Sequence, residues 1–457
     1  MAVSVVRRIL LFCFLASVCE GFDIQAAGVA AAGIAADFSP NARALGLLFS
    51  CSTLGLLIGA LFGGKVADAK GRKTILLASV ASFGLASLLT AAAPTVAWIC
   101  CGRFVTGLGL GGALPSIIAL AAEADPNESR RSYIAILYSG APLGAALASL
   151  TSLLVAAAHW RWVFGVGGLL ALALAPLLRV FMPESASFAL VRKMRFARAS
   201  KWNDGIRTLP ARLNEVWSVR TFLLWIGFCL SLLTVYLLLN WLPTLLVSRG
   251  LDHAQAAAAQ IGFNVGGAAT ILAISRLLDT RSRRIVIVLT FALIPCALAL
   301  LALLPSKYLG MTVLSIMLGG AVLASQSIVY ALAPRIYPTA IRGFGLGTAV
   351  AAGRVGAIAG PILVGFILSK NRGATDVLLT LVPLVTAAGL ATLWLDALTR
   401  NDVRSEDLNL IGNEANFLGS SIPQPTGPSQ APDVRAGSGR IAINSIDMGC
   451  IREWLND

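Results

Sequence analysis

The chain has 457 residues, of which 57% are apolar and only 13% are charged. A soluble domain carries about 25% charged residues, so this composition excludes an ordinary soluble protein and indicates a membrane protein. The formal charge of +14 does not indicate nucleic-acid binding, because the basic residues lie in the polar connections between apolar segments.

Twelve apolar segments of about 20 residues follow one another, each long enough to cross roughly 30 Å of hydrocarbon. The first segment has an alternative interpretation as a signal peptide, because Arg7 and Arg8 precede it, but the two acids inside it argue against that. We predict an all-α polytopic membrane protein with twelve transmembrane helices. The predicted spans are 9–35, 44–66, 74–93, 96–122, 131–157, 161–182, 221–247, 254–278, 284–304, 308–334, 343–369 and 374–398.

The first span carries two acids, Glu20 and Asp23, among apolar neighbours. An ionised group at the bilayer centre costs roughly 2.5–3.5 kcal/mol and normally faces water or a partner. Their spacing of three residues places both side chains on one helix face. The rise of about 1.5 Å per residue puts Asp23 at the depth of Arg103 in the span 96–122, so we hypothesise an ion pair between them. Both acids are candidate proton-coupling residues, and the alternative is a static network that braces the helices.

The connection after the second span reads GGKVADAKGRK, residues 63–73. It matches the G-x-x-x-D-x-x-G-[RK]-[RK] signature of the major facilitator superfamily, which the chain resembles in length, segment count and position of this loop. A degenerate second copy of the motif, SRLLDTRSRR, occupies residues 275–284. We expect Gly64 to allow a close helix approach and Asp68 to accept from N–H groups at a helix N-terminus. We interpret the motif as a conformational latch between two halves, and the alternative is an ordinary charged turn. The candidate latch residues are Gly64, Asp68, Gly71, Arg72, Lys73, Asp279, Arg283 and Arg284, with Glu123, Arg130, Arg131 and Glu184 as further members.

Two polar stretches divide the chain. The basic segment 183–220 separates two groups of six spans, and the stretch 419–440 is rich in Pro, Gly and Ser. The resemblance implies the major facilitator fold of two six-helix bundles. We predict an N-terminal bundle at 1–182, a cytoplasmic linker at 183–220, a C-terminal bundle at 221–398 and a disordered cytoplasmic tail at 399–457. With the N-terminus in the cytoplasm, the inner connections hold most of the Lys and Arg residues, so both termini are predicted to be cytoplasmic.

The span 343–369 places Arg354 close to the midplane, while the acids of the second half lie at helix ends or in connections. A substrate carboxylate would neutralise this arginine, because a guanidinium binds such an anion through two parallel hydrogen bonds. The alternative is packing against backbone carbonyls, which applies to Arg103 as well. The other candidate substrate-binding residues are Arg103, Gln25, Tyr138, Asn240, Asn264, Gln326 and Tyr330, with Trp241 as an aromatic surface for a ring.

Further stretches resemble the aromatic acid:proton symporters of the same superfamily. These are EGFDIQAAGVAAAGIAADF, GRFVTGLGLGGALPSIIALAAEADPNESRR, MPESASF and YALAPRIYPTAIRGFGLGTAVAAGRVGAIAGP. The resemblance implies a secondary transporter of the bacterial inner membrane that imports an aromatic monocarboxylate, such as a hydroxyphenylpropionate, by proton symport. It implies a monomer driven by the proton gradient, without cofactor, metal or nucleic acid. Related symporters often have Asp where this chain has Glu20.

Three alternatives stay open. A drug:proton antiporter usually shows G-x-x-x-G-P-x-x-G-G in the fifth helix, where this chain has YSGAPLGAAL. A membrane sensor of the same fold would bind without transport. An enzyme would need a nucleophile with a base, or a metal set, and the two His and the scattered Cys provide neither pattern.

Overall fold

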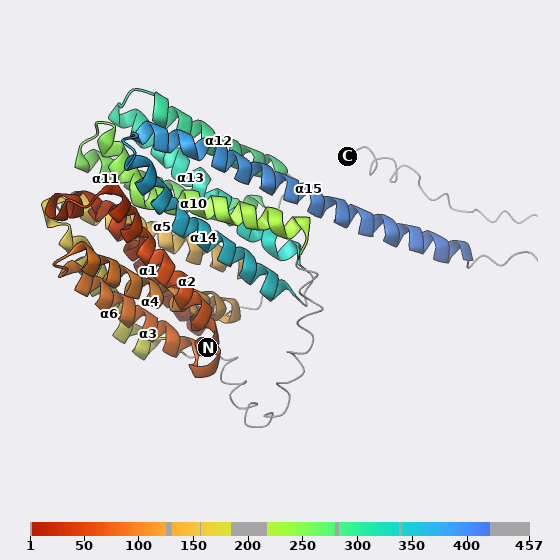
Figure 1. Ribbon diagram of the computed structural model, residues 1–457. Coiled ribbons are helices and arrows are strands. Elements are labelled where there is room, and N and C mark those ends of the chain that lie inside the picture. Colours follow the sequence, from red (N-terminus) through yellow and green to blue (C-terminus); the bar gives the residue numbers. More distant parts are fainter. Residues whose placement is uncertain are drawn as a thin grey trace, which may run out of the picture. The chain divides into compact units, whose positions relative to one another are not determined.

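The computed structural model describes residues 2–124, 130–155, 157–183, 217–278, 283–337 and 341–420. Within these residues it has twelve long α-helices and no strand, so the all-α prediction is confirmed. Figure 1 shows the helices in two neighbouring groups, α1 to α6 and α10 to α15, which we call the first and second halves. The first half has α1 (Ala2–Phe38), α2 (Ala42–Lys70), α3 (Arg72–Ala91), α4 (Val96–Ala124), α5 (Arg130–Leu154) and α6 (Arg161–Phe181). The second half has α10 (Val219–Ser248), α11 (His253–Leu277), α12 (Arg283–Leu303), α13 (Tyr308–Leu332), α14 (Arg342–Leu368) and α15 (Ala374–Ser420).

Eleven of the described helices are long and apolar enough to cross a membrane, and α1 is not among these eleven. The apolar part of α15, Ala374–Thr399, agrees with the predicted span 374–398, and the helix itself continues to Ser420. Its last residues are therefore helical where we expected the start of a disordered tail. Residues 184–216 of the predicted linker and 421–457 of the predicted tail lie outside the described part of the chain. The division into two bundles, a linker and a tail stays a prediction.

Small residues bring α2 and α4 into close contact. A Cβ added at Gly55 would lie 2.1 Å from the carbonyl oxygen of Phe104, and one at Gly107 would lie 1.9 Å from that of Ser52. Gly64, which we expected to make such a contact, has no neighbour within 4 Å of an added Cβ, so that expectation is wrong. Each residue turns a helix by about 100°, and the contact with α4 falls on Gly63 instead.

The two halves meet where α5 packs against α11 and where α2 packs against α14. We call the second contact the seam, and it includes the end where α2 begins and α14 ends. Arg43 Nε donates to Ser369 Oγ at 2.9 Å, and a Cβ at Gly46 would lie 2.7 Å from the carbonyl oxygen of Pro361. Farther along the same helices, Ser50 Oγ donates to a carbonyl of α14 at 2.8 Å. The seam therefore joins α2 to α14 through close backbone packing and hydrogen bonds.

Candidate functional site

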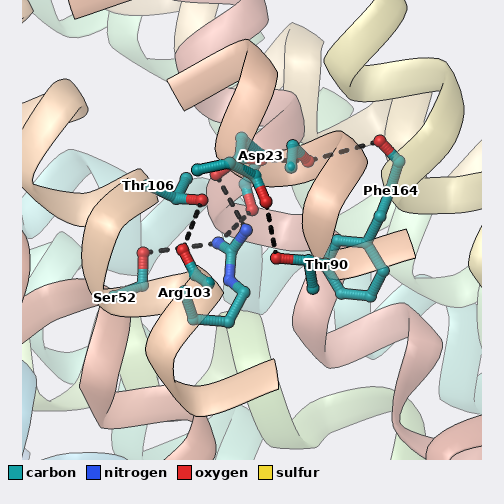
Figure 2. Close-up of polar contacts among 9 residues, drawn as sticks. Asp23, Ser52, Thr90, Arg103, Thr106 and Phe164 are labelled. Atoms are coloured by element: carbon teal, nitrogen blue, oxygen red, sulfur yellow. Dashed lines mark hydrogen bonds and ion pairs between the residues drawn. The ribbon is translucent and has the colours of Figure 1, made fainter. Parts of the chain in front are cut away.

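A buried ion pair joins α1 to α4, as hypothesised from the sequence. Arg103 Nη1 lies 2.9 Å from Asp23 Oδ2, and Arg103 Nη2 donates to the backbone oxygen of Asp23 at 2.7 Å. The exposed fractions of the two side chains are 0% and 2%. Two neighbouring serines complete the pair, since Ser87 donates to Asp23 at 2.9 Å and Ser52 accepts from Arg103 at 3.3 Å. Figure 2 shows the guanidinium between Asp23 and Ser52.

A small cavity of about 10 Å³ lies beside Arg103 of this pair. Its polar lining includes Ser52, Thr53 and Arg103 from the first half and Tyr236 and Asn240 from α10. That volume is room for about one water molecule. The ion pair therefore borders a space that both halves line.

A second pair of opposite charges comes from different halves. Glu20 on α1 is 4% exposed and Arg354 on α14 is 8% exposed, and the two interact electrostatically. Arg354 Nη1 donates to the hydroxyl of Tyr236 at 2.7 Å. Within the described residues, Glu20 makes no hydrogen bond and no ion pair at contact distance. The sequence predicted that Arg354 lacks an acid in its own half, and the structure provides one from the other half.

Aromatic side chains surround this second charge pair. The rings of Tyr138 on α5 and Tyr330 on α13 have centroids 6.1 Å apart, and Phe228 packs edge-on against Tyr330 at 4.8 Å. Both tyrosines interact electrostatically with Glu20 and Arg354. Gln326, also on α13, lies near the hydroxyl of Tyr330. The predicted residues Glu20, Tyr138, Gln326, Tyr330 and Arg354 therefore belong to one cluster, which we call the Glu20–Arg354 site.

The amide side chains predicted to bind substrate lie apart from the Glu20–Arg354 site. Gln25 Nε2 donates to the backbone oxygen of Leu239 at 2.7 Å, and Asn264 Nδ2 lies 3.4 Å from Gln25 Oε1. Asn240 Nδ2 donates to the carbonyl of Tyr236 within its own helix at 2.7 Å. Gln25 and Asn264 thus join the two halves, whereas Asn240 borders the small cavity.

Trp241 packs between helices and does not offer an open aromatic surface. It is 1% exposed, its Nε1 donates to the carbonyl of Pro361 at 3.1 Å, and its ring packs edge-on against Phe49 at 5.1 Å. Tyr236, five residues earlier, is the aromatic residue of α10 that contacts Arg354.

The structure describes only some of the candidate latch residues. Gly71 joins α2 to α3 with φ of 104°, a conformation that favours glycine. Lys73 Nζ donates to the carbonyl of Arg179 at 2.9 Å, and Arg283 pairs with Asp396 on α15, so each of these contacts stays within one half. Arg72 and Arg284 lie at the starts of α3 and α12. Two latch candidates lie outside the described residues, Glu184 and Asp279. The structure also does not describe the side chains of Asp68, Glu123, Arg130 and Arg131. The latch role stays a prediction.

Four residues of these clusters escaped prediction, namely Ser52, Ser87, Tyr236 and Gln260. The last of these, Gln260, donates through Nε2 to Gln25 Oε1 at 3.1 Å. The serines resemble many others in the apolar segments and carry no sequence signal. Tyr236 and Gln260 were recognisable as isolated polar groups in the apolar runs LLTVYLLLN and AAAAQIGFN, each four residues before a candidate asparagine.

Comparisons with known proteins identify the family of the chain. The family model of the Major Facilitator Superfamily matches residues 13–361 and 250–418. The 3-(3-hydroxy-phenyl)propionate transporter of Escherichia coli K12 is 40% identical, with 84% of this chain and 92% of the relative covered. The gallate transporter of Pseudomonas putida is 34% identical and the 4-hydroxybenzoate transporter of Pseudomonas aeruginosa is 32% identical, each over 84% of this chain and 90% of the relative.

Solved structures share the fold. The crystal structure of a D-xylose-proton symporter superposes with a TM-score of 0.68 at 17% identity, covering 86% of this chain and 97% of that one. The xylose transporter of E. coli in an inward open conformation gives a TM-score of 0.65 at 18% identity, covering 85% and 95%.

Proposed function

Because the chain belongs to the major facilitator superfamily, a family of multi-pass membrane transporters, we propose that it imports an aromatic monocarboxylate together with a proton. The relatives support the substrate class, since their names describe transporters of hydroxyphenylpropionate, gallate and 4-hydroxybenzoate. They also favour a transporter over an enzyme. The distribution of Lys and Arg supports placement in a bacterial inner membrane with both termini cytoplasmic.

The observation that carries the proposal is the Glu20–Arg354 site. Arg354 donates one hydrogen bond to Tyr236, and a guanidinium has five N–H groups, so donors are available for a substrate carboxylate. Arg103, by contrast, already binds Asp23 through two nitrogens. We therefore assign the anion to Arg354 and a supporting role to Arg103. The surrounding tyrosines offer ring surfaces to an aromatic acid.

Proton coupling follows from competition for Arg354. An ionised Glu20 is the electrostatic partner of Arg354 and opposes the arrival of a second carboxylate. When Glu20 takes up a proton, Arg354 becomes available to the substrate, so proton and anion bind together more favourably than either alone. Asp23 is held by Arg103 and Ser87, which makes it the second candidate for the exchanged proton. The proton gradient then supplies the energy, without a cofactor.

Transport and binding measurements on Glu20→Gln test this assignment. The variant should bind hydroxyphenylpropionate without the pH dependence of the parent, lose accumulation against a gradient and keep counterflow exchange. Asp37→Asn, which removes an exposed acid near the C-terminal end of the same helix, is the matched control. Accumulation that persists in Glu20→Gln and disappears in Asp23→Asn would move the proton to Asp23.

Arginine substitution tests the anion site. Arg354→Lys keeps the charge and loses the two-pronged geometry, so substrate affinity should fall about 10-fold or more, as expected for the loss of one charged hydrogen bond worth about 1.5–3 kcal/mol. Titration of ligand binding to the purified protein measures this. Unchanged affinity would remove Arg354 from the site.

A further inference from the structure

Three buried amides meet where α1 faces α10 and α11. Gln25, Gln260 and Asn264 are each 0% exposed. Gln25 Oε1 accepts from Gln260 Nε2 at 3.1 Å and from Asn264 Nδ2 at 3.4 Å, while Gln25 Nε2 donates to the backbone oxygen of Leu239 at 2.7 Å. We call these three side chains the amide cluster.

Backbone carbonyls determine which way each amide points. The oxygen of Leu239 can only accept, so the NH₂ group of Gln25 must face it and the oxygen of Gln25 must face the other two amides. Gln260 and Asn264 therefore turn their NH₂ groups toward Gln25. Asn264 also donates to the backbone oxygen of Gln260 at 3.0 Å, which orients its amide independently of Gln25. The side-chain oxygens of Gln260 and Asn264 consequently point away from the cluster.

These two oxygens are buried and accept no hydrogen bond from the described part of the chain. An unsatisfied buried acceptor costs about 1–3 kcal/mol, so a hydrogen-bond donor belongs beside each of them. A carboxylate has no proton to donate, which excludes the acid group of the substrate. A hydroxyl group on the aromatic ring of the substrate has a proton to donate. The apolar ring that carries it suits the surrounding helices.

We propose that Gln260 and Asn264 form an acceptor subsite for a ring hydroxyl of the transported acid, whose carboxylate binds Arg354. The subsite rests on the proposed function and narrows its substrate class to hydroxylated aromatic acids. Gln260 and Asn264 are uncharged and differ from the residues that we assign to the carboxylate and the proton.

The distances along the helices suit one small molecule. Leu239, which holds Gln25, lies three residues or about 4.5 Å along α10 from Tyr236, the partner of Arg354. Gln25 lies five residues or about 7.5 Å along α1 from Glu20. The two sites are therefore close enough along both helices for one aromatic acid to span them.

In this structure α1 covers the cluster, because a Cβ at Gly28 would lie 2.6 Å from the oxygen of Leu239. Exposure of a central site to each side in turn requires the two halves to separate here. That motion breaks the hydrogen bond of Gln25 to Leu239, while Asn264 keeps its orientation through the backbone of Gln260.

The parent protein and a ligand series provide the first test. Affinities are measured for 3-(3-hydroxyphenyl)propionate, for 3-phenylpropionate, which lacks the hydroxyl, and for the methyl ether, which lacks the donated proton. The hydroxylated acid should bind at least 10-fold more tightly than both others, because a site that pairs with a hydroxyl discriminates against ligands without it. Equal affinities for the three acids would overturn the subsite while leaving aromatic-acid binding intact. Binding of none of them would overturn the proposed function itself.

Variants then test whether Gln260 and Asn264 cause the preference for the hydroxylated acid. Gln260→Met and Asn264→Leu keep side-chain size and remove the acceptors, so the preference for the hydroxylated acid should shrink about 10-fold while 3-phenylpropionate binds as before. Thr270→Val is the matched control on α11, because the hydroxyl of Thr270 donates to Gly266 of its own helix at 2.8 Å. An equal loss of both ligands, or an unchanged preference, would overturn the proposal. If a variant does not fold, the ligand series on the parent protein still decides it.

Discussion

At the level of single residues, the two buried arginines differ in how their donors are used. Arg103 binds a carboxylate of its own half, whereas Arg354 bonds to a phenol and faces an acid of the other half across the site. An arginine with a permanent partner stabilises the helices around it. An arginine whose partner can be protonated can exchange that partner for a substrate.

The ion pair makes a prediction about stability. Asp23→Asn leaves Arg103 as an uncompensated buried charge, so the free energy of unfolding should fall by about 3–5 kcal/mol. Thermal unfolding of the purified protein measures the loss. The double variant Asp23→Asn with Arg103→Gln should lose less than the sum of the two single changes, because the stranded charge is gone. Additive losses would show that the pair does not act as a unit.

At the level of helices, glycine positions decide how closely neighbours approach. Association in lipid depends on van der Waals packing, which small residues permit by bringing backbones together. The contacts of Gly55 and Gly107 between α2 and α4 are of this kind. The same two helices carry Ser52 and Arg103, which hydrogen bond beside the ion pair with α1.

Alanine should lower the melting temperature at a glycine in close helix contact and should not lower it at a glycine without a neighbour. Gly107→Ala places a methyl group 1.9 Å from the oxygen of Ser52, so the helices must move apart and the melting temperature should fall by several degrees. Gly165→Ala on α6, where an added Cβ meets nothing within 4 Å, is the control and should melt at the parent temperature or above it. Equal melting temperatures for the two variants would contradict the packing argument.

The end of α1 provides a pH-dependent contact outside the predicted spans. Trp160 Nε1 donates to Asp37 at 2.9 Å and Arg161 donates to the same oxygen. These hydrogen bonds, with the nearby charge of Arg161, lower the pKa of Asp37. A carboxyl whose pKa is lower in the folded state contributes stability above its ordinary pKa of about 3.9 and loses it as the pH falls through the folded value.

Acid titration of stability checks this contact. The parent should lose a small amount of stability below about pH 4, and Asp37→Asn should lack that component, because the amide does not titrate. The effect should be small, since the pair is exposed to water. Parallel melting curves of parent and variant across the acid range would rule out a contribution from Asp37.

At the level of the whole molecule, the two halves contact each other along the seam, in the amide cluster and where α5 packs against α11. Arg43 with Ser369, Gly46 with Pro361 and Gln25 with Leu239 each join one half to the other. These contacts hold the halves together in this state, and a transporter must break them to expose its centre to the opposite side.

A bulky residue in the seam should therefore shift the conformational equilibrium. Gly46→Leu adds atoms where a Cβ alone would lie 2.7 Å from the oxygen of Pro361, so the seam should open. Spin labels on the connections 39–41 and 369–373, in a cysteine-free background, should show longer distances than in the parent. Gly347→Leu on α14, where an added Cβ has no neighbour within 4 Å, should leave the distances unchanged. Unchanged distances in Gly46→Leu would mean that the seam does not control opening.

The sequence alone determined the helical class, the order of the spans and the depth of the charged groups. Helix hydrogen bonds are local and the rise per residue is constant, so the pairing of Asp23 with Arg103 followed from counting residues. The end of α15 escaped prediction, because a polar helix carries no hydropathy signal.

Only the tertiary structure decided which side of each helix meets which neighbour. One residue turns a helix by about 100°, so Gly63 and Gly64 face different neighbours. The five residues from Tyr236 to Trp241 turn α10 by a net angle of about 140°, so these two side chains also lie on different faces. The meeting of Glu20 with Arg354, and of Gln25 with Gln260, depends on how two halves far apart in the chain pack together. Neither is fixed by any local property of the chain.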